Sequence, residues 1–118
     1  MKTLNAYVIY NADTTIDLFQ KVNKEFEHIS SQHGTDIEKA IDAINSRSVD
    51  MLIMDKKLDK PTQVKLNKLI DLIDPDVATV ELHMNDEDFI RFKLGDMNRK
   101  WQEANSHSIV NFIDNPQL

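Results

Sequence analysis

Residues 49–61 read VDMLIMDKKLDKP, and this stretch decides the fold. Four consecutive apolar residues, 51–54, lie between two acids, Asp50 and Asp55, and two lysines follow. A short apolar run that is continuous rather than alternating is typical of a strand buried on both faces of a parallel sheet. We therefore expect a central parallel strand over 50–55 that ends on a carboxylate.

Similar apolar runs recur along the chain, and segments with helical spacing of apolar residues lie between them. The predicted order is a strand at 6–10, a helix at 14–26, an edge strand at 27–31, a helix at 36–46, a strand at 50–55, a helix at 60–73, a strand at 77–82, a helix at 86–104 and a strand at 108–113. Strict alternation predicts right-handed crossovers and a parallel sheet with helices on both faces. We expect a single α/β domain over 1–118: a doubly wound, five-stranded, three-layer flavodoxin-like fold without a final helix.

Local signals predict where several helices begin. Thr35 and Glu38 have the spacing of a capping box. Asp59 is a candidate N-cap, with Pro61 in the first turn. The acidic run 85–88 (NDED) is most simply an N-cap and a first turn favoured by the helix dipole.

Composition excludes several classes of protein. The 118 residues contain no cysteine, which rules out disulfides and thiolate metal sites. A net charge of −6 without a long basic run argues against nucleic acid or an anionic membrane as partner. The first apolar run stops at Asn11, too early for a signal peptide or a membrane span. We expect a cytoplasmic protein.

Polar residues are expected to gather at the carboxyl ends of the strands, where ligands of doubly wound sheets bind. The two glycines, Gly34 and Gly95, do not follow the first strand, so a nucleotide-binding loop is not indicated. The residues expected at these strand ends are Asn11, Asp13, Asp55, Lys56, Lys57, His83, Asn85, Asp114 and Asn115.

Residues 26–58, FEHISSQHGTDIEKAIDAINSRSVDMLIMDKKL, resemble part of a two-component receiver domain. In that family a strand is followed by a turn with glycine, here His33-Gly34, then by a helix and a further strand. An acid opens this strand and a phospho-accepting aspartate closes it, and Asp50 and Asp55 match these two positions. Strand order and length extend the resemblance over nearly the whole chain, although only this middle third is specific.

The chain departs from the receiver pattern where receivers bind metal and respond to the phosphoryl group. Receivers carry an acidic pair for Mg²⁺ after the first strand, a Ser or Thr at the end of the fourth, and Lys-Pro after the fifth. The matching residues here are Tyr10 and Asn11, then Leu82-His83-Met84, then Asn115-Pro116. The resemblance therefore implies a degenerate, pseudo-receiver-like domain.

These departures weaken the expected phosphosite, because phosphoryl transfer relies on positioning and on neutralising the transferred charge. Mg²⁺ would have only Asp13 and Asp55 as acidic ligands, a poor set for this cation. Lys56 or Lys57 is the candidate substitute for the missing charge. The alternative is a purely structural Asp55, paired to a lysine or to a helix N-terminus.

The helix at 86–104 carries a possible interaction surface. Ile90, Leu94, Met97, Trp101 and Ala104 form the stripe expected to pack on the sheet. Phe89 and Phe92 lie beside that stripe, which indicates either a protein partner or wider burial of the helix. Without a final helix one sheet face is short of cover, so we expect either a bent helix over it or a homodimer that uses this helix, strand 108–113 and the uncovered face.

The leading hypothesis is a stand-alone receiver-like domain that regulates or signals through protein–protein contact, with phosphorylation lost or altered. We expect no enzymatic activity and no cofactor, except Mg²⁺ if phosphorylation is retained. One alternative is a competent phosphoacceptor that uses Asp55. Another is a small flavodoxin-like enzyme or ligand-binding protein that uses Asp55, His83 and Asn115.

Overall fold

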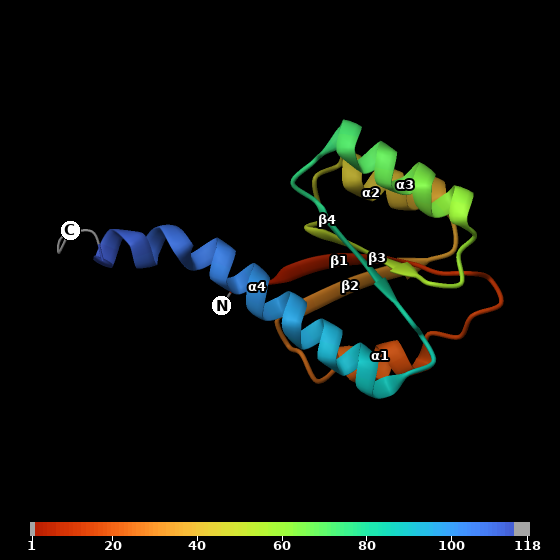
Figure 1. The fold of residues 1–118 in the computed structure, drawn as a ribbon, viewed down its shortest axis with the longest axis horizontal. Helices are drawn as coiled ribbons and strands as arrows, with labels where there is room; N and C mark the ends of the chain where they lie inside the picture. The colour runs from red at the N-terminus through yellow and green to blue at the C-terminus, as the bar shows by residue number, and fades with distance from the viewer. Residues whose placement is uncertain (1, 115–118) are drawn as a thin grey trace.

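The computed structural model describes residues 2–114, with side chains described as far as residue 105. Strands and helices alternate strictly along this part of the chain (Figure 1). In chain order they are β1 (Leu4–Ile9), α1 (Asp17–Asn23), β2 (Ile29–Gly34), α2 (Ile37–Asn45), β3 (Met51–Asp55), α3 (Lys60–Ile73), β4 (Ala78–Leu82) and α4 (Glu87–Asp114).

The described strands form one parallel sheet in the order β2-β1-β3-β4. β1 is paired on both sides, with Leu4 opposite Ile29 on β2 and Ala6 opposite Met51 on β3. β4 lies at the other edge, with Met51 opposite Ala78. The α/β class, the parallel sheet and the edge position of the second strand are thus confirmed, and the order is compatible with a flavodoxin-like fold.

The prediction of a fifth strand at 108–113 is wrong. These residues belong to α4, which continues to Asp114, so the sheet of the described residues has four strands rather than five. A short apolar run fits a helix as well as a strand. After Gly95 the next glycine or proline is Pro116, so the sequence lacks a helix breaker before the predicted strand.

The helices cover both faces of the sheet, α2 and α3 one face and α1 and α4 the other (Figure 1). Because β2 and β3 flank β1 on opposite sides, right-handed crossovers place α1 and α2 on opposite faces. α4 leads to no further described strand, so this rule does not fix its face. It packs beside α1, and the face expected to be short of cover is therefore covered.

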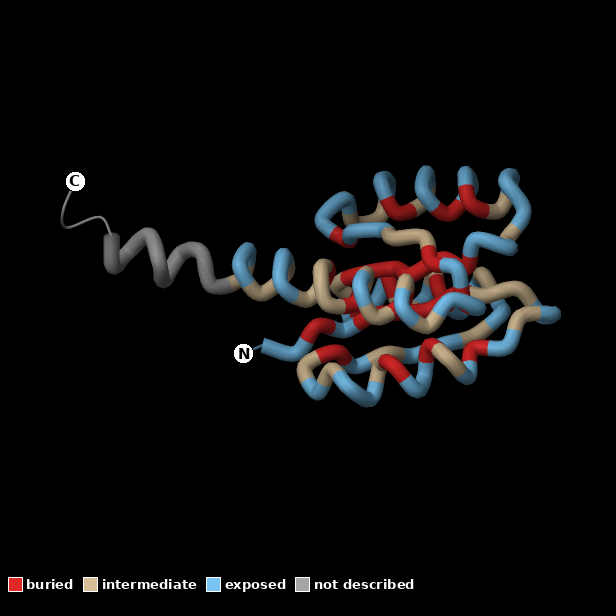
Figure 2. The backbone as a smooth tube through the Cα atoms, turned by 60° about the horizontal axis from the view of Figure 1, so that its bottom comes forward, coloured by how far each residue is buried: buried red, intermediate tan, exposed pale blue. Residues whose placement is uncertain are grey.

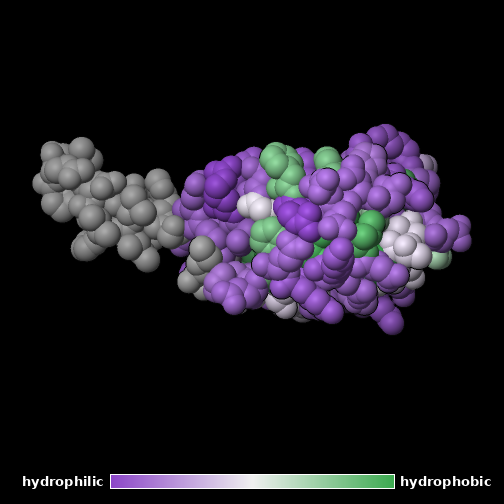
Figure 3. Space-filling model, turned by 90° about the horizontal axis from the view of Figure 1, so that it is seen from below, coloured by the Kyte–Doolittle hydropathy of each residue, from purple (hydrophilic) through white to green (hydrophobic). Residues whose placement is uncertain are grey.

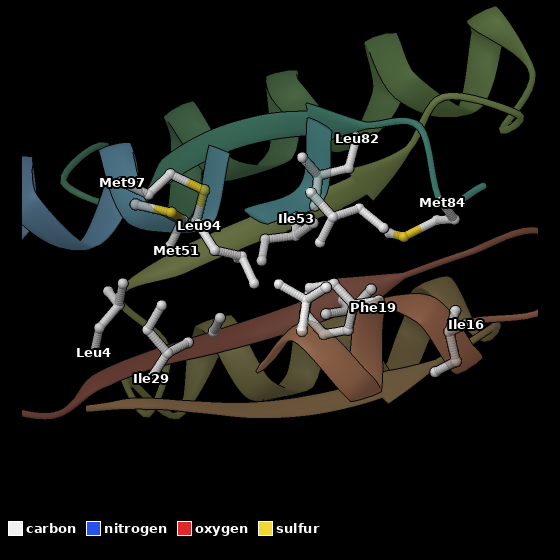
Figure 4. Close-up of a cluster of buried hydrophobic side chains, with 14 residues drawn as sticks. Leu4, Ile16, Phe19, Ile29, Met51, Ile53, Leu82, Met84, Leu94 and Met97 are labelled. Carbon is white, nitrogen blue, oxygen red and sulfur yellow. The ribbon is translucent and has the colours of Figure 1, made fainter. Parts of the chain in front are cut away.

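Each sheet face has its own apolar core, and the buried residues concentrate in the sheet and on the helix surfaces that face it (Figure 2). Phe19 of α1 and Leu94 of α4 lie in the first core with Ile53 and Leu82 of the sheet (Figure 4). The predicted stripe of α4 is buried at Ile90, Leu94 and Met97 and partly buried at Trp101, whereas Ala104 is exposed.

Two of the predicted helix starts have different outcomes. Asp59 caps α3 as predicted, because its carboxylate accepts hydrogen bonds from the backbone N–H (3.4 Å) and the hydroxyl (2.7 Å) of Thr62. The prediction of a capping box formed by Thr35 and Glu38 is wrong. The N-cap of α2 is Asp36, whose Oδ1 accepts the Glu38 N–H at 2.9 Å, since its extended backbone brings the carboxylate to that donor.

Candidate functional site

Asp55 ends β3 with its carboxylate buried and both of its oxygens hydrogen-bonded. The residue is 1% exposed. Its Oδ2 accepts a hydrogen bond from the backbone N–H of Asn11 at 3.0 Å, and its Oδ1 accepts one from the backbone N–H of Lys57 at 2.9 Å. Hydrogen bonds to an ionised acceptor are stronger than neutral ones. The carboxylate therefore ties the loop after β1 to the loop after β3.

Asn11 makes a second link between the same two loops. Its Nδ2 donates to the carbonyl oxygen of Lys57 at 3.3 Å. Its Oδ1 accepts the N–H of Asp13 at 2.8 Å, and its carbonyl oxygen accepts the N–H of Thr14 at 2.8 Å, which closes the turn after β1. The structure thus brings together Asn11, Asp55 and Lys57, which the sequence placed at neighbouring strand ends.

The two lysines after Asp55 have different positions. Lys56 Nζ lies 3.9 Å from Oε2 of Glu81 on β4, and its backbone N–H donates to the carbonyl of Leu82 at 2.9 Å. Lys57 contacts Asp55 through its backbone N–H, and its side chain is exposed. Among residues with described side chains, no lysine forms an ion pair with Asp55.

A pocket of about 190 Å³ lies beside these loops. Ligand pockets commonly reach about 300–1,000 Å³, so this one suits only a small group. The Oγ1 of Thr14 is buried and has no hydrogen-bond partner among the described residues. Sequence reasoning missed Thr14 and Thr15, although both directly follow Asp13 at a strand end. The pocket is lined by Asp13, Thr14, Thr15, Leu18, Lys57, Met84 and Asn85.

The remaining predicted site residues do not extend the pocket. His83 is exposed, and its ring packs edge-on against Phe89 with the ring centroids 5.3 Å apart. Asn115, with its predicted place at a fifth strand end, lies outside the described residues. Asp50 is at the opposite end of β3 from Asp55, where its Oδ2 accepts the N–H of Asn5 at 2.9 Å.

Metal-binding potential at the site is limited to single acids. Within the described part of the chain, no group of three or more His, Cys, Asp or Glu side chains is arranged to hold a metal ion. Asp13 is exposed and lines the pocket, whereas both oxygens of Asp55 accept backbone hydrogen bonds. Of the two acids predicted as weak Mg²⁺ ligands, Asp13 and Asp55, only Asp13 is therefore open to solvent.

α4 is anchored by charge to the turn that follows α1, and one of its phenylalanines is free of the core. Arg91 donates bidentately to Glu25, with both N–O distances 2.8 Å, and also bonds Glu87 at 2.9 Å. These hydrogen bonds lower the pKa of both glutamates. Phe89 packs partly against the core, whereas Phe92 is 67% exposed. The α1 and α4 side of the molecule is otherwise mostly hydrophilic, with separate hydrophobic areas (Figure 3).

The chain matches no family model, and no curated protein matches it. No helix in the described range 2–114 has the length and apolar character needed to cross a membrane. Function is therefore inferred from the strand-end residues themselves.

Proposed function

We propose that this protein is a receiver-like regulatory domain that acts through protein–protein contact and does not use phosphorylation of Asp55. One observation carries the proposal. Each oxygen of the Asp55 carboxylate accepts a backbone hydrogen bond, at 3.0 and 2.9 Å, and the residue is 1% exposed. A phosphodonor approaching this carboxylate meets a closed site.

The chemistry of phosphoryl transfer gives the reason. Transfer to a carboxylate needs a free oxygen in line with the donor and positive charge around the transferred group. At Asp55 one of the two loops has to move before an oxygen is free, and the backbone N–H of Asn11 or of Lys57 then loses its acceptor. Lys56 does not supply the positive charge, because its Nζ lies near Glu81 instead.

Asn11 supports the same interpretation. It occupies a position where receivers, which this chain resembles, carry an acid for Mg²⁺. Here its side chain bonds the carbonyl of Lys57 and the N–H of Asp13. The neutral amide thus links the two loops through its bond to Lys57 and orders its own loop through its bond to Asp13. We propose that this end of the sheet keeps one arrangement and that binding partners, rather than phosphorylation, provide regulation.

The experiment is intact mass spectrometry after incubation with Mg²⁺ and acetyl phosphate, with Asp55→Asn as the control. The expected result is an unchanged mass for both proteins, with circular dichroism showing that both are folded. A single phosphoryl adduct on the wild type that is absent from Asp55→Asn would overturn the proposal. Asp55 would then be a phosphoacceptor, the first alternative.

A ligand-binding function is a second candidate, favoured by the unpartnered Thr14 hydroxyl in the pocket of about 190 Å³. A buried hydroxyl without a partner is a site where a ligand atom gains a hydrogen bond. The test is a thermal-shift screen of small polar compounds against the wild type and Thr14→Val. A compound that stabilises the wild type and not the variant supports this function; no shift for either protein contradicts it.

A further inference from the structure

The outer edge of β4 presents unpaired backbone groups. β4 pairs with β3, and no segment within residues 2–114 pairs with its other side. Ala78 donates to Asp50 and Leu82 accepts from Lys56, so both residues direct their backbone groups toward β3. Because direction alternates along a strand, Thr79 and Glu81 direct their N–H and C=O groups outward.

The open edge is flanked by a groove on each side. The groove toward α4 has a volume of about 370 Å³ and is mainly apolar, with Val80, Met97 and Trp101 in its lining. The groove toward α3 has a volume of about 470 Å³ and contains Thr79, Glu81 and Lys93. Val80 and Lys93 line both grooves. An edge strand is usually protected by a proline, a bulge or a covering segment, and the sequence ATVEL of β4 contains no proline.

We propose that two copies of this chain join through β4, antiparallel and centred on Val80. A two-fold axis at Glu81 would place like charges opposite each other, which is unfavourable. An axis at Thr79 would pair Glu81 with Val77, whose N–H already donates to Asp74 at 3.1 Å. An axis at Val80 places Thr79 opposite Glu81 of the second copy, and all their outward backbone groups are then paired.

Charge complementarity favours a second copy of this chain as the partner that binds the β4 edge. In this register Glu81 of the second copy enters the groove beside Thr79, which Lys93 also lines. Within the range of described side chains Lys93 has no ion pair, and its Nζ lies 5.7 Å from the centroid of the Phe89 ring. Among the described side chains, Glu81 forms an ion pair only with Lys56, at a long distance of 3.9 Å. The two-fold axis makes each new Lys93–Glu81 contact twice, so the edge complements itself.

The apolar groove also fits this arrangement. The two Val80 residues form a pair that is not hydrogen-bonded, the closer kind of antiparallel pair, with side chains on one sheet face. Val80 lines the groove with the buried Met97 and the partly buried Trp101, so Val80 of the second copy covers the open part of Trp101. In this dimer, the second copy of the chain is the protein partner that the proposed function requires. The dimer proposal rests on the proposed function only in assuming that the protein acts through protein–protein contact. Its test does not involve Asp55.

The first test is disulfide trapping. The protein has no cysteine, so Val80→Cys introduces a single thiol on the two-fold axis. Closest antiparallel pairs have Cα atoms about 4.5 Å apart, within the range that a disulfide spans. The control is Leu72→Cys, an 81% exposed position on α3. Under mild oxidation at micromolar concentration, Val80→Cys should form a covalent dimer at least about tenfold faster than the control.

The second test is a charge exchange measured by sedimentation equilibrium. Glu81→Lys and Lys93→Glu should each raise the dimer Kd by about tenfold, because each loses two ion pairs per dimer. The double variant should recover most of the affinity. Lys39→Glu, on an exposed position of α2, is the matched control and should leave the Kd unchanged.

A wild-type monomer throughout the micromolar range, with equal trapping of Val80→Cys and Leu72→Cys, would overturn the dimer. The β4 edge would then be free for a strand of another protein. Circular dichroism of each variant separates loss of folding from loss of association. The mass of the wild type in sedimentation equilibrium tests the dimer without any variant. Phosphoryl labelling of Asp55 would contradict the proposed function and leave this result unaffected, so the two failures are distinguishable.

Discussion

Replacing Asp55 with alanine should destabilise the protein by about 2–4 kcal/mol. The change removes the acceptor of two backbone N–H groups, those of Asn11 and Lys57. A buried donor left without an acceptor costs about 1–3 kcal/mol. Two such donors give about 2–6 kcal/mol. Water that reaches part of this site, and the removal of a buried carboxylate, offset some of this loss and lower the upper end to about 4 kcal/mol.

Asparagine at the same position should cost about half as much, because its side chain keeps one acceptor oxygen. The assay is urea unfolding at pH 7, with the slope of the transition required to stay constant. Asp13→Ala is the matched control: Asp13 is exposed, and the hydrogen bond from its backbone N–H to Asn11 survives the change. It should alter stability by less than about 0.5 kcal/mol.

A result for Asp55→Ala within about 0.5 kcal/mol of the wild type would refute the reasoning. The carboxylate would then not hold the two loops together. A buried acid that contributes nothing to folding is better explained by a role in function. This result would therefore support the alternative that Asp55 is a phosphoacceptor.

Three further predictions concern other parts of the molecule. Gly34→Ala places a Cβ 2.8 Å from the Tyr7 hydroxyl oxygen and should cost about 1–3 kcal/mol in urea unfolding, with recovery when Tyr7→Phe is added; no cost would show that the ring moves freely. Arg91→Met removes the hydrogen bond that lowers the pKa of Glu25 below its usual 4.5. In the wild type this hydrogen bond stabilises the fold fully above pH 4.5, and the stabilisation is lost as the pH falls through the lowered pKa. Acid unfolding of the variant should therefore depend less steeply on pH below about 4.5 than that of the wild type, and equal slopes would contradict this. Phe92→Ser should change stability by less than about 0.5 kcal/mol because Phe92 is 67% exposed, and a larger loss in thermal unfolding would mean that the side chain is buried in solution.

Much of the fold is predictable where local signals agree. α3 spans 60–73 as predicted, because Asp59 caps it, Pro61 suits its first turn and Pro75 follows its end. Apolar runs predicted β1, β3 and β4 with small shifts at their ends, whereas β2 was predicted at 27–31 as a half-polar edge strand and lies at Ile29–Gly34. The segment 108–113 was assigned wrongly, because six residues with an apolar run do not distinguish a strand from the continuation of a long helix.

The face on which α4 packs was not predictable, since it depends on the missing fifth strand. With a strand beside β4, a right-handed crossover would have placed α4 with α2 and α3. Without it, α4 covers the α1 face. The open β4 edge and its grooves follow from the same change, so Lys93 and Trp101 were not candidates in the sequence.

The candidate site was predictable in position and less so in detail. The carboxyl ends of parallel strands meet at one edge of a sheet, which brought Asn11 and Asp55 together as expected. The donors to Asp55 are backbone N–H groups rather than a lysine ammonium. This detail depends on the turn after β3, and on the register that places Glu81 near Lys56.

The central claim is that backbone hydrogen bonds close the Asp55 carboxylate, and amide hydrogen exchange at Asn11 and Lys57 tests it most directly. Both amides should be protected in the wild type, unchanged by Mg²⁺ and acetyl phosphate, and unprotected in Asp55→Ala. Fast exchange of both amides in the untreated wild type, or loss of their protection when Mg²⁺ and acetyl phosphate are added, would contradict the claim.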